Sequence, residues 1–263
     1  MCGYNAELLN GGIFQVAMAS KDLQGKTVWI TGGKRIGQSV AEGLASLGAN
    51  IAASYRSSKD EAEELISKAK AYDVKTLILR CDVSNRESAA RTVEKIKSKF
   101  GRLDILVLMA SIFRPIKFEN ITDKDFQANF DVHVKGTFWP IQVSLPLMNP
   151  GSHIITISDR TALGKIYPGY LPYVVTKGDV ANMTRALAVE LGPKGIFINS
   201  IAPGPILKPS DINDNEWLEL RNNSMIKYPI NDEEAVQEFV DTTVRLCFVR
   251  SSGGVYPLDF GCL

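Results

Sequence analysis

Short apolar runs alternate with amphipathic stretches from residue 26 to the end of this 263-residue chain. The apolar runs read KTVWITGG, ANIAASY, KTLILRCDVS, LDILVLMAS, SHIITIS, GIFINSIAPG and GGVYPLDF. Nearly continuous apolar strands are typical of a parallel sheet that helices cover on both faces. The alternation therefore predicts an α/β fold in a single domain, a Rossmann-type doubly wound parallel sheet flanked by helices on both faces.

The amphipathic stretches between these runs predict the helices. Helices are expected over 36–48 and 58–73, in a segment that ends near Phe100, over 123–148, around Tyr173 and over 232–249. Residues 1–22 are expected to form an N-terminal extension and residues 23–263 the domain. Residues 205–230 have the weakest pattern, and a loop of this length in a compact domain is typical of a substrate lid.

Composition excludes several classes of function. The chain has 30 Lys and Arg against 29 Asp and Glu, a net charge of +1, which favours neither nucleic acid nor an acidic membrane surface as a partner. No apolar run approaches the roughly 20 residues of a membrane span. The residues before 22 lack a basic leader, so a secretory signal is not expected. The four cysteines at 2, 81, 247 and 262 form neither a CxxC pair nor a metal-ligand spacing. We therefore expect free thiols, a cytoplasmic protein and no metal.

A glycine-rich turn, TGGKRIG, joins the first apolar run to the first helix. Glycines let the backbone approach a pyrophosphate, and the helix N-terminus directs N–H groups at the negative charge. The turn predicts a phosphate-binding loop that consists of Gly32, Gly33, Lys34, Arg35, Ile36 and Gly37.

A tyrosine and a lysine in PGYLPYVVTKGDV have the spacing that places both side chains on one face of a helix. Tyr173 and Lys177 are four positions apart, whereas Val174 stands four positions after Tyr170. An ammonium group near a phenol lowers the phenol pKa from its usual value of about 10. The Tyr173–Lys177 pair is thus the candidate proton donor.

Taken together, these segments resemble the short-chain dehydrogenase/reductase family from Leu23 to Phe260. TGGKRIG is similar to the family's TGxxxGIG loop, one residue shorter, with Arg35 at the usual place of the middle glycine, and the Tyr173–Lys177 pair matches the family's YxxxK. The resemblance implies that Lys177 also bonds the ribose of a nicotinamide cofactor.

The second apolar run indicates which nicotinamide cofactor is bound. AASYRSS has no acidic residue that could accept a bond from a ribose hydroxyl, so Arg56 is expected to bind a 2′-phosphate and NADP(H) is the expected cofactor. By the same resemblance, the remaining cofactor contacts are Tyr55, Ser57, Ser58, Asp82, Val83, Ala110, Ser111, Pro203, Gly204 and Ile206.

The chain departs from the family pattern at three places. LMAS, 108–111, replaces the family's NNAG, and His133 replaces an asparagine that holds a water in the proton relay. His133 is either a relay group, whose titration would then alter the relay, or a buried packing residue. In ITISDR, either Ser158 or Asp159 stands where the family's carbonyl-polarising serine is found. Aspartate at this place and a basic residue such as Arg35 before IG resemble the pteridine reductases, and MASIFRP is similar to their NASxFxP.

The expected activity is NADPH-dependent reduction of a C=O or conjugated C=N bond in a small hydrophobic or aromatic substrate, with Tyr173 as proton donor. Phe113, Tyr170 and Trp217 are the expected wall residues of the substrate site. The alternatives are a pteridine reductase, a 3-oxoacyl-carrier-protein reductase and a catalytically impaired scaffold or regulator. By family analogy the protein is expected to be a homotetramer or homodimer.

Overall fold

The computed structural model describes residues 22–164, 166, 168–208, 213–215, 217–218 and 231–261. The expected N-terminal extension lies outside the described residues except for Asp22. Of the expected lid, the structure describes 205–208, 213–215 and 217–218. Asp214, Asn215, Trp217 and Leu218 are helical.

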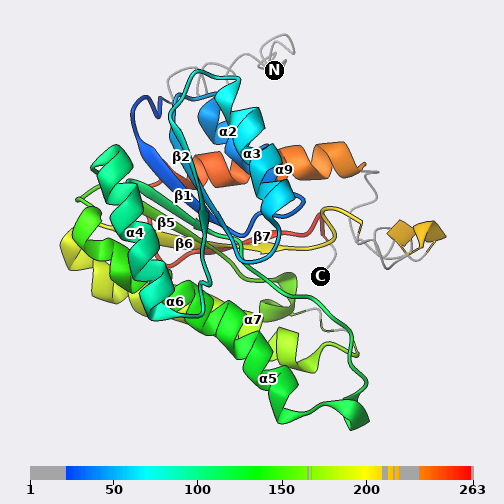
Figure 1. Cartoon of the computed structure of the whole chain (residues 1–263). Coiled ribbons are helices and arrows are strands. Elements are labelled where there is room, and N and C mark those ends of the chain that lie inside the picture. The colour runs from blue at the N-terminus through cyan, green and yellow to red at the C-terminus, as the bar shows by residue number, and fades with distance from the viewer. Residues whose placement is uncertain are drawn as a thin grey trace, which may run out of the picture.

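A seven-stranded sheet forms the centre of the domain (Figure 1). Its strand order is β3-β2-β1-β4-β5-β6-β7, and every neighbouring pair is parallel. This confirms the predicted doubly wound sheet, whose strand order reverses between β1 and β4. In open α/β sheets the ligand site lies at this switch point, outside the carboxyl ends of the strands. The strands are β1 (Thr27–Thr31), β2 (Asn50–Tyr55), β3 (Thr76–Arg80), β4 (Ile105–Leu108), β5 (His153–Ile157), β6 (Phe197–Pro203) and β7 (Val255–Leu258).

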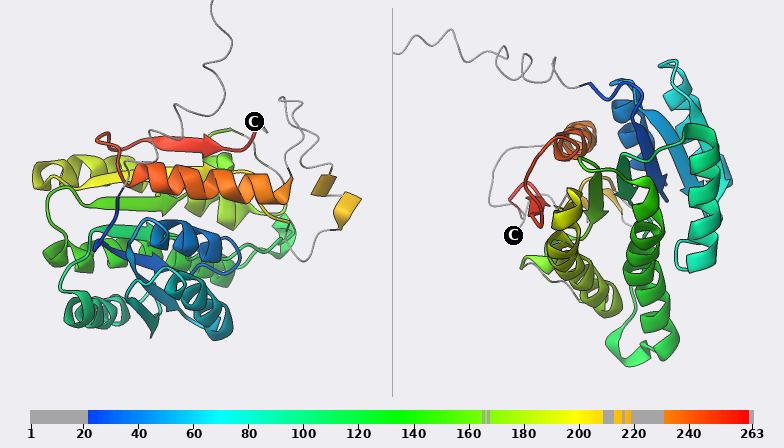
Figure 2. Two further views of the ribbon diagram at one scale, coloured as in Figure 1. Left: turned by 90° about the horizontal axis from the view of Figure 1, so that it is seen from above. Right: turned by 90° about the vertical axis from the view of Figure 1, so that its left-hand side faces the viewer.

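Helices cover both faces of the sheet because each face is apolar. On one face, α2 (Gly37–Ala45), α3 (Lys59–Lys70) and α9 (Asp232–Leu246) pack on a core that includes Ile30, Leu65 and Phe239. Helices α2 and α9 lie side by side there (Figure 2, left; blue and orange). On the other face, α4 (Arg86–Phe100), α6 (Gly136–Ser144) and α7 (Leu171–Leu191) enclose a second core around Trp29 and Leu106.

The ends of the helices follow local capping signals. The Asn85 side chain accepts a hydrogen bond from the backbone N–H of Ser88 at the start of α4, and Gly101, with φ of 75°, ends that helix near Phe100 as predicted. Asn231 and Glu234 form a capping box at the start of α9. The helices predicted over 36–48, 58–73 and 232–249 are shorter in the structure, because their last residues form turns.

The long helix predicted over 123–148 is interrupted. The structure divides it into α5 (Asp123–Asn129), a π-helical turn η3 (Phe130–Lys135), α6 and a 3-10 turn η4 (Leu145–Leu147). π turns are rare and are often found at functional sites. Here the turn carries His133, whose buried side chain contacts Ser111, Ile112 and Thr176. The other short turns are η2 (Phe118–Asn120), η5 (Arg160–Ala162) and η6 (Gly192–Lys194).

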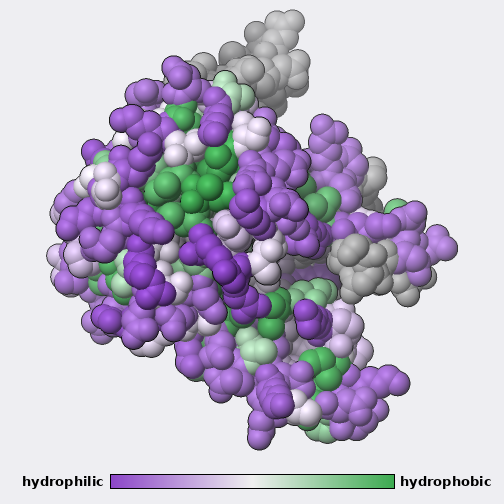
Figure 3. Space-filling model, viewed as in Figure 1, coloured by the Kyte–Doolittle hydropathy of each residue, from purple (hydrophilic) through white to green (hydrophobic). Residues whose placement is uncertain are grey.

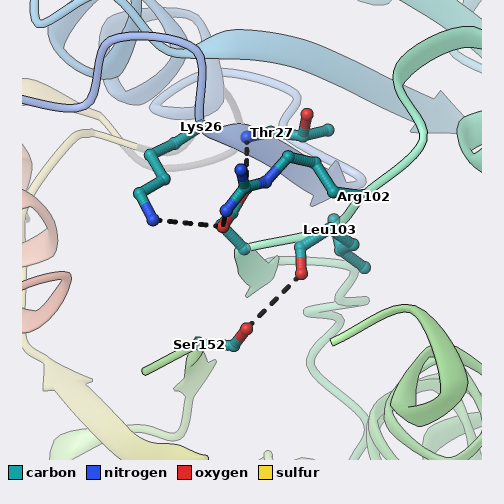
Figure 4. Close-up of polar contacts among 6 residues, drawn as sticks. Lys26, Thr27, Arg102, Leu103 and Ser152 are labelled. Carbon is teal, nitrogen blue, oxygen red and sulfur yellow. Dashed lines mark hydrogen bonds and ion pairs between the residues drawn. The ribbon is translucent and has the colours of Figure 1, made fainter. Parts of the chain in front are cut away.

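One carboxylate joins the two strands on either side of the switch point. Asp104, 7% exposed, accepts hydrogen bonds from the Thr27 backbone N–H (2.9 Å), Lys26 Nζ (3.3 Å) and Arg102 Nε (2.7 Å) (Figure 4). Its own N–H donates to the Thr27 carbonyl at 2.9 Å. These contacts hold the amino ends of β1 and β4 in register.

The described part of the chain has no helix that is both long and apolar enough to cross a membrane. Within the same residues, no group of three or more His, Cys, Asp or Glu side chains could hold a metal ion. Cys81 and Cys247 are buried free thiols. Hydrophilic side chains cover most of the face in Figure 3.

Candidate active site

A cavity of about 800 Å³ lies where β1, β2, β4, β5 and β6 end. Its size is typical of a site for a small molecule or cofactor. All but two of the residues singled out from the sequence line this cavity; the exceptions are Gly37 and His133. Gly37 is instead a buried first residue of α2, with the side chain of Leu65 next to it.

The glycine-rich turn lies at the start of α2. Gly32 has φ of 70°, and a Cβ atom there would lie 2.8 Å from Ala110 Cα, so the close approach of two backbones requires glycine. Arg35 also has a left-handed φ of 75°, which only glycine adopts without cost. The turn is one residue short of the family's loop, and Arg35 takes this conformation where a glycine usually stands. Its guanidinium donates to the Leu207 carbonyl.

The N-terminus of α2 can receive an anion. No side chain caps it, so its first backbone N–H groups remain available to a ligand. Lys34 pairs with Glu61 at 2.9 Å on the cavity's rim. The ion pair partly neutralises Glu61, and the first turn of α2 holds no acidic residue of its own, so the helix dipole favours an anion there.

The end of β2 contributes the cavity's second positive group. Arg56, Ser57 and Ser58 line the cavity there, and within the described residues the Arg56 guanidinium makes no hydrogen bond or ion pair. Asp82 also lines the cavity, but its Oδ1 accepts bonds from the Ser84 N–H (3.0 Å) and hydroxyl (2.6 Å). The Arg56 guanidinium and the two serines can bind a phosphate group through charge-assisted hydrogen bonds.

Helix α7 places Tyr173 and Lys177 on one buried face, as their spacing predicts. Tyr173 is 8% exposed and its hydroxyl donates to Asp159 Oδ2 at 2.8 Å. Lys177 Nζ donates to the Ile157 carbonyl at 2.8 Å and lies 5.7 Å from the centroid of the Tyr173 ring. Burial lowers the pKa of Lys177 from 10.5 to about 8, and the nearby Asp159 carboxylate opposes that lowering.

The structure separates the two candidates for the polarising position. Asp159 faces the Tyr173 hydroxyl, and its Oδ1 accepts a hydrogen bond from the Thr161 N–H at 2.9 Å. Ser158 is 1% exposed, donates to the Ile201 carbonyl at 3.2 Å and accepts from the Ser200 hydroxyl at 2.9 Å. Successive residues at the end of a strand point to opposite sides, so Ser158 faces β6 while Asp159 faces the phenol.

His133 lies behind this site rather than in its lining. It is 1% exposed, and its pKa falls from 6.5 to about 2 because of burial and of repulsion by Lys177. The imidazole is therefore neutral near pH 7. A neutral, buried ring favours the packing alternative over a relay group that titrates near neutrality, and the role of His133 stays a prediction.

Aromatic rings form one wall of the cavity. Phe113 stacks on Tyr170, with ring centroids 4.3 Å apart, and contacts Tyr173 edge-on at 4.8 Å. Trp217 also lines the cavity, and its indole N–H donates to Asp232 Oδ1 at 3.1 Å. A flat apolar substrate fits such a wall.

Three charged residues line the cavity without having been predicted from the sequence: Glu61, Arg114 and Arg160. Arg160 is 4% exposed and directly follows Asp159, and Arg114 follows Phe113, so adjacency to a predicted residue was the available signal for both. Glu61 had no such signal, because its contact with Lys34 depends on how α3 packs beside the loop.

The fold and this site define the class of Rossmann-type oxidoreductases, in which a glycine-rich turn and a buried tyrosine–lysine pair face one cavity. The family model described as enoyl-(acyl carrier protein) reductase matches residues 32–255. The chain belongs to the short-chain dehydrogenase/reductase family, and it is an oxidoreductase of that family.

Known proteins similar to this chain agree with that assignment. The 3-oxoacyl-[acyl-carrier-protein] reductase FabG of Staphylococcus aureus strain Mu50 is 33% identical over 209 residues, 78% of this chain and 83% of that protein. A short-chain dehydrogenase/reductase from Serratia marcescens BCRC 10948 superposes with a TM-score of 0.82 at 29% identity, over 91% of this chain and 98% of that one. A blue fluorescent protein from a metagenomic library, solved in complex with NADPH, has a TM-score of 0.82 at 28% identity, over 92% and 99% of the two chains.

Proposed function

We propose that this protein uses NADPH to reduce a C=O or conjugated C=N bond in a small hydrophobic or aromatic substrate, with Tyr173 as the proton donor. The observation that carries the proposal is the buried Tyr173 hydroxyl, which bonds Asp159 at 2.8 Å beside the Lys177 ammonium. All three side chains line one cavity with the aromatic wall.

The cavity's other end fits NADPH. The uncapped α2 N-terminus and the Gly32 turn would hold the pyrophosphate, and Arg56 with Ser57 and Ser58 would hold the 2′-phosphate. A similar solved structure contains NADPH, which supports the same choice here. Ala110, Ser111, Pro203, Gly204 and Ile206 line the part of the cavity that would receive the nicotinamide.

Bound NADPH would supply the hydride, and the chain's own residues would supply the proton and the orientation. Lys177 has its ammonium close to the phenol, which favours the phenolate and so helps Tyr173 to give up its proton. The same ammonium would bond the nicotinamide ribose. Phe113 and Tyr170 would hold an apolar or aromatic substrate against the reacting end of the cavity.

Asp159 favours a C=N substrate over a simple ketone. A carboxylate repels the oxyanion that develops when a ketone is reduced, and it cannot donate a hydrogen bond as a serine hydroxyl does. It can accept a bond from a ring N–H, or relay a proton through Tyr173 to a ring nitrogen. The contact between Asp159 and Tyr173 thus supports a pteridine-type reductase as the second candidate.

Two other candidates have less support. A 3-oxoacyl-carrier-protein reductase is favoured by the Staphylococcus aureus relative but disfavoured by Asp159 in contact with the phenol. An impaired scaffold is disfavoured because Tyr173 and Lys177 both remain, buried and hydrogen-bonded, at the end of an open cavity.

We also infer that the protein is a homodimer or homotetramer. Phe118, Phe126 and Phe130 are 77%, 38% and 41% exposed around α5 and η3, an apolar surface that a second copy would cover. Sedimentation velocity tests this inference, and a monomer at micromolar concentration would contradict it.

NADPH oxidation measured over a panel of ketones, quinones, acyl thioesters and pterins tests the proposed reaction. On any substrate found, Tyr173→Phe should lower kcat by about 10²- to 10⁴-fold, because it keeps the ring and removes the proton donor. NADPH affinity should change little, since the phenol is not its main anchor. Tyr170→Phe is the matched control and should affect mainly KM. Wild-type turnover by Tyr173→Phe would contradict the role given to Tyr173.

A further inference from the structure

Two departures from the family pattern, Ser111 and His133, contact one another. Ser111 stands in the turn after β4, where the family's NNAG ends, and its Oγ lies 3.0 Å from His133 Nε2. The same nitrogen accepts a hydrogen bond from the backbone N–H of Ile112 at 3.2 Å. The substitutions therefore form one hydrogen-bonded group instead of two independent defects.

The other side of the imidazole contacts the catalytic helix. His133 Nδ1 lies 2.8 Å from Thr176 Oγ1, and the Thr176 hydroxyl lies 2.8 Å from the Pro172 carbonyl and 3.1 Å from the Tyr173 carbonyl. Thr176 immediately precedes Lys177 in α7. The His133 ring also meets the Tyr173 ring edge-on, with centroids 5.4 Å apart.

These contacts determine where the imidazole proton lies. A backbone N–H can only donate, so Nε2 accepts from Ile112 and carries no proton. A neutral ring then holds its proton on Nδ1 and donates it to Thr176 Oγ1, whose own proton goes to the backbone of α7. Burial and the neighbouring Lys177 ammonium, which lower the pKa of His133 to about 2, keep the ring in this form.

We propose that His133 is a positioning residue whose imidazole joins the turn after β4 to helix α7, and so sets Tyr173 and Lys177 relative to Ser111 and Ile112 across the cavity. Ser111 and Ile112 line the cavity from the turn after β4, while Tyr173 and Lys177 line it from α7. The π turn η3 places His133 between these two elements. Because the imidazole has two nitrogens, it can form hydrogen bonds to the turn after β4 and to helix α7 at the same time.

Imidazole ¹⁵N NMR tests the proposal without any turnover. The chain has two histidines, His133 and His153, so the spectrum of His133→Asn assigns both rings. We expect His133 to be an Nδ1–H tautomer from about pH 5.5 to about pH 8, a range in which an ordinary imidazole titrates. A charged ring within that range, or a proton on Nε2, would overturn the proposal.

The second test measures the kinetics of Thr176 variants. It rests on the proposed reduction, because it needs the substrate found for that reaction. Thr176→Val keeps the side-chain shape but leaves the buried Nδ1–H without an acceptor, so kcat should fall by about 5- to 100-fold while KM and NADPH affinity change by less than about threefold. Thr176→Ser restores the acceptor and should restore most of kcat. His133→Asn combined with Thr176→Val should lose little more than the larger single effect.

The outcomes separate positioning from the alternatives. If Thr176→Val and His133→Asn both keep wild-type kcat, the histidine only packs and the proposal is wrong. If His133→Asn alone removes an inflection of the pH–rate profile near neutrality, His133 is a relay group and the proposal is again wrong. If no substrate turns over, the reductase assignment fails, but the NMR experiment can still overturn the hydrogen-bonded link through His133, because a charged ring or a proton on Nε2 would break it.

Discussion

Removal of the buried charge at Lys177 should change how stability depends on pH. Lys177→Met keeps the length of the side chain and its apolar part but cannot bind a proton. In the folded protein burial lowers the pKa of Lys177 from 10.5 to about 8. Since each pKa unit corresponds to about 1.4 kcal/mol, the ammonium destabilises the folded state by about 3 kcal/mol at neutral pH.

The sign follows from proton binding. Below pH 8 both the folded and the unfolded states carry the proton, and the full cost of burying the charge is present. As the pH rises from about 8 towards 10.5, the folded state loses the proton first and the cost disappears, so this group makes the wild type more stable at alkaline pH. The methionine variant lacks that gain.

Urea unfolding of the cofactor-free protein measures the effect. The free energy of unfolding of Lys177→Met minus that of the wild type should decrease by about 2.5 kcal/mol between pH 7 and pH 10. Changes in apolar packing shift this difference equally at both pH values, so they do not hide the slope. Lys124→Met, on the surface of α5, is the matched control. A difference that is constant with pH, or that grows at alkaline pH, would refute the reasoning.

Two further predictions concern charges elsewhere in the molecule. Arg56→Ala should weaken NADPH binding by about 10- to 100-fold in a fluorescence titration and leave NADH binding nearly unchanged. The reason is that only the 2′-phosphate loses a charge-assisted partner. An equal loss for both cofactors would contradict the 2′-phosphate site. Asp104→Asn should lower the free energy of unfolding by about 1–3 kcal/mol, since Lys26 and Arg102 lose a charged acceptor at a largely buried position. The exposed pair of Lys59 and Glu63 is its control, and Glu63→Gln should cost less than about 0.5 kcal/mol; equal effects would mean that Asp104 does not tie β1 to β4.

The strands along the chain and the place of the phosphate-binding turn could be predicted from local patterns. Each apolar run that was quoted from the sequence contains one of the strands β1 to β7. The glycine-rich turn and the Tyr173–Lys177 spacing are also local, because a turn conformation and a helical face depend on residues a few positions apart. The sequence determined the fold class, and within it the cavity shared by these two motifs.

Only the tertiary structure decided which side chains contact one another. Ser158 and Asp159 are adjacent, and the pairing of β5 with β6 turns the serine towards Ser200 and leaves the aspartate for Tyr173. The sequence left His133 as either a relay group or a buried packing residue, because its partners Ser111, Ile112 and Thr176 come from two distant segments.

The same distinction explains the interrupted helix and the unpredicted charges. The π turn in 123–148 has no signal in hydrophobic spacing, since it depends on hydrogen bonds that His133 makes to other elements. Glu61 reaches Lys34 only because α3 packs beside the turn after β1. Local periodicity reports how a segment folds, whereas side-chain partners depend on the distances between segments, and those distances arise only when the whole domain packs.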